Sequence, residues 1–174
     1  PPRPVLGLAV GITGHRALDA AGLVPLEILI GELLREIADA AHDVGRQHAN
    51  LFHDTVPRLV MLSQLAAGAD QLASRVALDH GYRLHAVLPF AHAEYGHDFA
   101  PGPERDSFDE LFDQCESWWH LPNSRSDGAT GYALAGEATV AQVDVLIAVW
   151  DGKASRGPGG TADVIDYAVR RGVP

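Results

Sequence analysis

The chain has 174 residues, of which 47% are hydrophobic and 21% are charged, values typical of one globular domain with a substantial core. Its formal net charge of −10 argues against nucleic acid as a partner, because proteins that bind nucleic acid ordinarily carry a basic surface. No apolar run reaches the roughly 20 residues of a membrane span and the N-terminus lacks a signal-peptide pattern, so we expect a cytoplasmic protein without membrane contact.

Four apolar runs, each typical of a strand buried on both faces of a parallel sheet, recur along the chain. They occupy residues 5–11, 58–62, 84–90 and 145–150, and helical patterns lie between and after them. This order predicts an α/β fold, a Rossmann-like three-layer sandwich with a central parallel sheet and helices on both faces. The apolar stripe at residues 26–37 is a candidate homodimer surface or, alternatively, part of the core.

Residues 91–127 interrupt the alternation of strands and helices. We predict a lid-like insertion there, at the carboxyl end of the third strand, with a helix over residues 104–118. Trp118 and the adjacent Trp119 are expected to serve packing. Residues 172–174 resemble the beginning of a further strand, so residues 1–174 are predicted to form a single domain whose last strand is truncated.

The same segment carries aromatic and titratable side chains that are candidates to contact a ligand or a metal ion. Tyr95 and Phe99 are candidates to cover a base. The histidines and carboxylates match no standard metal-binding spacing, so neither a metal ion nor another cofactor is expected from His92, Glu94, His97 and Asp98.

Three glycine-containing loops follow the first, second and fourth apolar runs. Because the carboxyl ends of parallel strands meet at one edge of a sheet, we expect these loops to form one ligand-binding cleft. Glycines allow close backbone approach, Arg16 can donate to phosphate, and a helix that begins near Thr161 points free N–H groups at an anion. Asp70 is either a helix cap or a contact for a ribose hydroxyl. The predicted ligand-binding residues are Gly11, Thr13, Gly14, His15, Arg16, Gly68, Asp70, Asp151, Gly152, Gly159, Gly160 and Thr161.

Five short motifs, taken in order, resemble those of the SLOG superfamily: GITGHR, LAAGADQLASRVA, YRLHAVLPF, EYGHDF and DVLIAVWDG…GGTADVI. That superfamily is similar to the LOG cytokinin-activating phosphoribohydrolases and to the Rossmann-like core of the DNA-processing protein A family. The resemblance implies a Rossmannoid domain that binds nucleotides or nucleotide derivatives, often as a sensor coupled to an effector domain. It implies a phosphate-loop role for Gly159, Gly160 and Thr161 and a first-loop role for residues 11–16.

The chain departs from the enzymatic branch of that superfamily. LOG hydrolases resemble one another in the motif P-G-G-x-G-T-x-x-E, whose glutamate is used in catalysis, whereas Val164 stands three residues after Thr161 here. Our leading hypothesis is therefore binding or sensing of a nucleotide or nucleotide derivative through its phosphate. The alternative is a nucleotide phosphoribohydrolase or N-glycosidase with Asp163 or Glu137 as the acid. A third hypothesis, a domain related to DNA processing, is disfavoured by the net charge.

Overall fold

Five parallel strands form the centre of the molecule, in the order β4-β3-β2-β1-β5. The computed structural model describes residues 2–53, 56–155 and 159–174. The strands are β1 (Gly7–Gly14), β2 (Arg58–Ser63), β3 (Arg83–Leu88), β4 (Cys115–His120) and β5 (Val145–Val149). The predicted Rossmann-like α/β fold is confirmed, with four of the five strands lying at the four predicted apolar runs.

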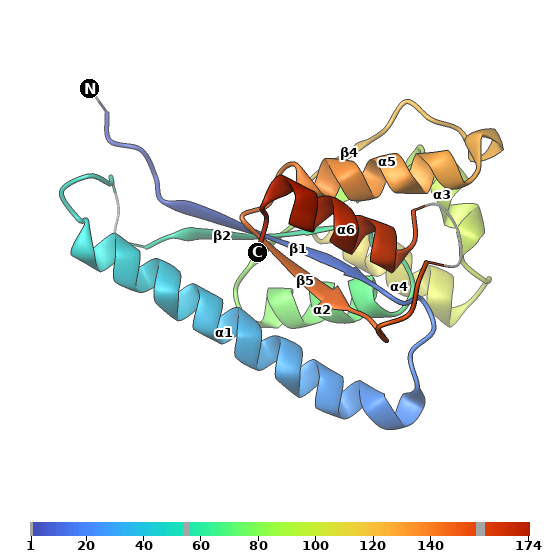
Figure 1. The fold of residues 1–174 in the computed structure, drawn as a ribbon, viewed down its shortest axis with the longest axis horizontal. Coiled ribbons are helices and arrows are strands. Elements are labelled where there is room, and N and C mark those ends of the chain that lie inside the picture. Colours follow the sequence, from blue (N-terminus) through green and yellow to red (C-terminus); the bar gives the residue numbers. More distant parts are fainter. Residues whose placement is uncertain (1, 54–55, 156–158) are drawn as a thin grey trace.

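Helices cover both faces of this sheet (Figure 1). On one side lie α1 (Leu23–Gln47), α2 (Ala69–Asp79) and α4 (Pro103–Asp113), and on the other lie α5 (Ala129–Val140) and α6 (Thr161–Arg171). Strand residues alternate between the two faces, so that Met61 packs with Leu34 of α1 while its neighbours Val60 and Leu62 pack with Ala138 of α5. Short helical turns complete the fold: η1 (Ala20–Gly22), α3 (His92–Tyr95), η2 (Gly96–Asp98) and η3 (Arg125–Asp127).

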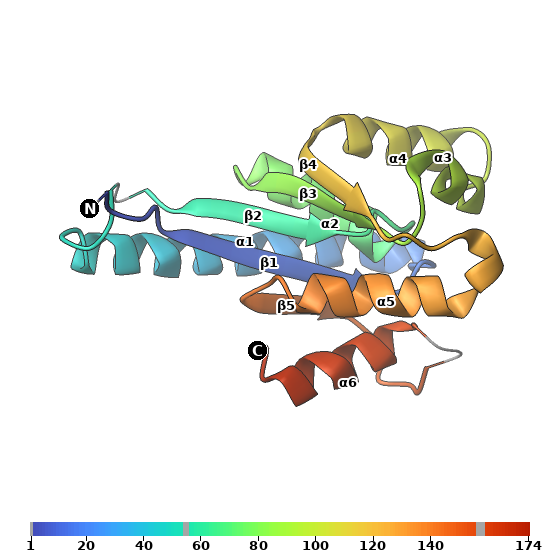
Figure 2. The ribbon, with the colours of Figure 1, turned by 90° about the horizontal axis from the view of Figure 1, so that it is seen from above.

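The edge strand β4 corrects one sequence-based expectation. The helix expected over residues 104–118 ends at Asp113, and the following residues pair with β3 instead (Figure 2). This strand belongs to the edge of the sheet, where polar residues can face water, and so it lacks an apolar run. Trp118 and Trp119 are neighbours on a strand and therefore point to opposite faces; they remain 50% and 39% exposed rather than packed inside.

The other predicted segments have mixed outcomes. Part of residues 91–127 extends the sheet as β4, while α3 and η2 lie next to the carboxyl edge, where the lid role stays a prediction. The Leu146 N–H donates to the Pro174 carbonyl at 2.8 Å, which places the last residue beside β5. Most of the apolar stripe on α1 faces the core: Ile30 and Leu34 are buried, and Leu26 and Ile37 pack against the same cluster. Leu29 and Leu33 are exposed. Within the described residues, no helix combines the length and hydropathy of a membrane span.

Candidate functional site

A cavity of about 710 Å³ opens at the carboxyl ends of β1, β2 and β5. The register of the sheet brings these strand ends together, because Gly14 at the end of β1 pairs with Val149 at the end of β5. Nine of the predicted ligand-binding residues line the cavity, namely Thr13, Gly14, His15, Arg16, Asp70, Asp151, Gly159, Gly160 and Thr161. The three predicted loops therefore converge, as we expected from the parallel topology.

The remaining predicted glycines lie outside the lining. β1 continues through Gly14, so Gly11 is a strand residue, and a Cβ there would lie 3.1 Å from Leu146 Cδ1 and Val143 Cγ1. Gly11 thus permits tight packing of the sheet rather than contact with a ligand. Gly152 has a φ of +78° and forms the turn after β5. Gly68 lies directly against the backbone of the first loop, at His15 and Arg16.

Gly68 and Gly14 let three chain segments meet beneath the cavity. Gly68 has a φ of +82°, and a Cβ on it would lie 2.3 Å from the Arg16 carbonyl oxygen. A Cβ on Gly14 would lie 2.4 Å from Ala69 Cβ. The Ala69 N–H donates to the His15 carbonyl at 3.1 Å, and the His15 N–H donates to the Val149 carbonyl at 3.2 Å. The loop that carries Arg16 is therefore fixed against both β5 and the start of α2.

The Arg16 side chain is held by a buried carboxylate. Asp98, whose side chain is 4% exposed, lies 3.6 Å from Arg16 Nη2 and 2.7 Å from Arg125 Nη2. The Tyr132 hydroxyl also donates to this carboxylate, and the Arg16 guanidinium lies 5.5 Å from the centre of the Tyr132 ring. Arg16 is thereby oriented while its side chain stays 47% exposed at the cavity. It retains N–H groups for a ligand anion.

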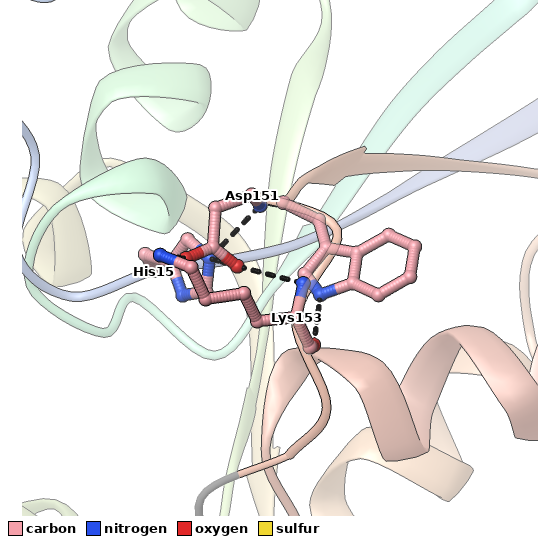
Figure 3. A network of polar contacts seen from close by, with 4 residues as sticks. His15, Asp151 and Lys153 are labelled. Atoms are coloured by element: carbon pink, nitrogen blue, oxygen red, sulfur yellow. Dashed lines mark hydrogen bonds and ion pairs between the residues drawn. The ribbon is translucent and has the colours of Figure 1, made fainter.

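His15, Asp151 and Lys153 form a second polar network at the cavity (Figure 3). The Asp151 N–H donates to His15 Nε2 at 3.1 Å, and the Asp151 carboxylate lies 3.2 Å from the same nitrogen. Lys153 donates to that carboxylate from its backbone N–H at 3.1 Å and from Nζ at 3.0 Å. The hydrogen bonds from Lys153 lower the pKa of the Asp151 carboxyl to about 2. Asp151 is consequently ionised at neutral pH, and it braces the loop after β5.

The start of α6 forms the third side of the cavity. Gly160 is the N-cap residue and Thr161 is the first residue of the helix. Glycine has no side chain to cap the free N–H groups there. An α-helix begins with N–H groups that lack a partner inside the helix, and its dipole gives this end partial positive charge. The Gly159 N–H donates to Asp163 Oδ2 at 3.0 Å. Asp163, proposed from the sequence as an acid, therefore stabilises the start of α6; Glu137, the other candidate, is exposed and does not line the cavity.

Asp70 lies at the floor of the cavity and is 5% exposed. Burial raises the pKa of this carboxyl to about 7, although hydrogen bonds from the Ala66 and Gln64 backbone partly oppose the shift. The same hydrogen bonds hold the chain that follows β2. Leu65 in this turn has a φ of +58°, a conformation rare for residues other than glycine. Its N–H donates to Ser63 Oγ at 2.9 Å. Asp70 thus stabilises a strained turn from the first turn of α2, whose N-cap residue is Gly68, and its contact with a ligand stays a prediction.

Aromatic residues occupy different positions from those expected. Tyr95 and Phe99 are 0% and 5% exposed and pack around Phe108 in the core, so the expectation that they cover a base is wrong. Tyr132 and Trp150 line the cavity instead. Trp150 could have been found as the aromatic residue that ends the fourth apolar run. Tyr132 has no such local signal because α5 reaches the cavity only through the tertiary fold.

The comparisons with known proteins bear on the fold. No family model matches the sequence, and no curated protein is recognisably similar to it. DNA processing protein A from Streptococcus pneumoniae is similar in structure with a TM-score of 0.56 at 19% identity, over 98% of this chain and 48% of that one. The Helicobacter pylori protein of the same name gives a TM-score of 0.54 at 16% identity, over 96% and 63%. The chain shares the fold of the matched part of DNA processing protein A.

This likeness confirms the Rossmann-like fold that the sequence resemblance implies. The chain spans less than two thirds of the length of either DNA processing protein A. The Helicobacter pylori DNA processing protein A binds single-stranded DNA, which overturns the expectation that net charge excludes nucleic acid as a partner. Net charge is a sum over the whole surface, whereas an anion responds to the groups at one site. In the described part of the chain, no three His, Cys, Asp or Glu side chains gather as metal ligands would.

Proposed function

We propose that the cavity binds nucleotide units of single-stranded DNA through their phosphate groups. The observation that carries this proposal is the convergence of Arg16 and the start of α6 on one cavity at the carboxyl edge of the sheet. An exposed guanidinium donates to phosphate in a bidentate manner, and the N-terminus of a helix favours negative charge. The likeness to a protein that binds single-stranded DNA supports nucleic acid as the source of that phosphate.

The charges around the cavity favour one or two phosphates rather than a long stretch of backbone. Arg16, Arg125 and Lys153 each have an aspartate partner. Their charges are therefore partly neutralised before any ligand binds, and the chain as a whole carries a net charge of −10. The protein is expected to hold single-stranded DNA at a local site, with modest affinity and with little preference for sequence.

A free nucleotide or nucleotide derivative is the second candidate ligand. The observation in its favour is the size of the cavity, since about 710 Å³ lies within the range of small-molecule sites. The negative net charge also penalises a long polyanion more than a single nucleotide. Both candidates use the same phosphate contacts and differ in whether the sugar-phosphate chain continues out of the cavity.

Fluorescence anisotropy with labelled oligothymidylates of increasing length, at fixed ionic strength, separates the two candidates. Binding of single-stranded DNA predicts saturable binding that is competed by unlabelled oligonucleotide and only weakly by thymidine monophosphate. A free-nucleotide site predicts the reverse, with the monophosphate as the stronger competitor. Absence of binding of either ligand at millimolar concentration would refute the proposed function.

A further inference from the structure

Trp150 presents a large aromatic surface beside the proposed phosphate site. It follows β5 directly, lines the cavity, and is 43% exposed. Burial of an aromatic side chain of this size contributes substantially to stability, and that contribution is partly forgone here. Exposed apolar surface at the wall of a cavity is typical of a place where a ligand packs.

The indole ring is fixed in place by the turn that follows β5. Its Nε1–H donates to the Lys153 carbonyl at 2.7 Å, so the polar atom of the ring is satisfied within the protein. The Lys153 N–H in turn donates to the Asp151 carboxylate, and the Asp151 N–H donates to His15 (Figure 3). A ring that is already ordered loses little conformational entropy when a ligand packs on it.

The ring makes no aromatic or cation–π contact with the described residues. Among the described residues, the aromatic rings that pair with one another do not include Trp150, and no arginine or lysine cation stacks on it. Trp118 differs in this respect, because its ring lies 5.1 Å from Phe112 and 6.5 Å from His120. Trp150 is therefore a partly exposed ring whose polar atom is hydrogen-bonded and which lacks an aromatic or cationic partner among the described residues.

We propose that Trp150 is a stacking platform for a nucleobase, and that the phosphate of the same ligand lies at Arg16 and the start of α6. The inference rests on the proposed function and extends it from the phosphate to the base. Trp150, which follows β5, lines the same cavity as Arg16 and as Thr161 at the start of α6. Because every base has an aromatic face, stacking here selects single-stranded over paired bases without selecting sequence.

The test compares a labelled oligothymidylate with an abasic oligonucleotide of equal length, which has the same phosphates but no bases. The wild type should bind the oligothymidylate about tenfold more tightly than the abasic strand. Trp150→Leu should abolish that preference and leave the affinity for the abasic strand unchanged, while Trp150→Phe should retain most of it. The matched control is Trp119→Leu on β4, which changes a tryptophan of similar exposure outside the cavity lining and should leave both affinities unchanged.

A fluorescence measurement reports on the ring directly and does not need a variant at position 150. The chain has three tryptophans, so the double variant Trp118→Phe/Trp119→Phe leaves Trp150 as the sole indole. Oligothymidylate should quench its emission, and the abasic strand should not. Equal binding of the two strands by the wild type, or emission unchanged on saturation, would overturn the stacking platform and leave phosphate binding intact. Failure of the wild type to bind either strand would overturn both proposals.

Discussion

At the scale of single residues, Gly68 is a position where the backbone of the first loop leaves no room for a side chain. Gly68→Ala is expected to lower the free energy of unfolding by about 3 kcal/mol or more, because the strain of a positive φ adds to overlap with the Arg16 carbonyl oxygen. Gly81→Ala is the matched control: its φ is +79°, but its Cβ would meet nothing within 4 Å, so we expect a cost of only about 1–2 kcal/mol. Urea unfolding measures both, and equal costs would contradict the close approach.

The buried carboxyl of Asp70 predicts a dependence of stability on pH. Its pKa is raised from 3.8 to about 7 in the folded state, so between these values the folded protein holds a proton that the unfolded chain has lost. The contribution of Asp70 to stability should therefore fall as the pH rises from about 4 to about 7, by about 1.4 kcal/mol per pH unit, and stay level above that.

Urea unfolding of the wild type and of Asp70→Asn at several pH values checks this prediction. Subtracting the two series isolates the contribution of Asp70 from that of the other ionisable groups. The stability of the wild type relative to the variant should decline between pH 5 and pH 7. A difference that does not change with pH would show that Asp70 titrates at its ordinary value.

At the scale of elements, a variant of Asp163 distinguishes a structural role at the start of α6 from a role as a catalytic acid. Asp163→Asn should cost about 0.5–1 kcal/mol of stability, because it weakens the hydrogen bond to the Gly159 N–H at the start of α6. Asp166→Asn, an exposed change further along the same helix, should cost less. Nucleoside monophosphates incubated with the wild type should release no free base by chromatography. Base release that the wild type shows and Asp163→Asn loses would instead support the hydrolase alternative.

Local sequence patterns predicted the elements that are buried and continuous along the chain. Val145–Val149 is recognisable as a strand because the run is continuously apolar, although β5 lies at an edge of the sheet and only Ile147 in it is buried. The glycines at 159 and 160 mark the helix start that follows. β4 escaped prediction because its exposed edge permits the polar sequence CESWWH. The contacts that orient Arg16 were not predicted for another reason. Asp98 and Tyr132 belong to segments distant in the sequence, and no local pattern indicates that they contact Arg16.

At the scale of the whole molecule, the distribution of charge predicts how binding responds to salt. Binding of single-stranded nucleic acid weakens with salt in proportion to the number of phosphates neutralised, with a slope of about −0.7 per contact. Arg16 and Lys153 are the cations that line the cavity in the described part of the chain, so the slope of log K against log salt is expected to lie between about −1 and −2. Anisotropy titrations at several salt concentrations measure it. A slope of −4 or steeper would indicate an extended basic surface elsewhere.

The most direct test of phosphate binding at this cavity is the affinity of Arg16→Ala for a labelled oligothymidylate. Asp98 keeps Arg125 and the Tyr132 hydroxyl as partners in this variant, so the fold should persist, and urea unfolding would verify it. The control is Arg46→Ala, which removes an exposed arginine of α1 outside the cavity lining. Loss of a charge-assisted hydrogen bond should weaken binding by about 1.5–3 kcal/mol in Arg16→Ala and leave Arg46→Ala near the wild type. Equal affinities for the wild type and a folded Arg16→Ala variant would contradict the account.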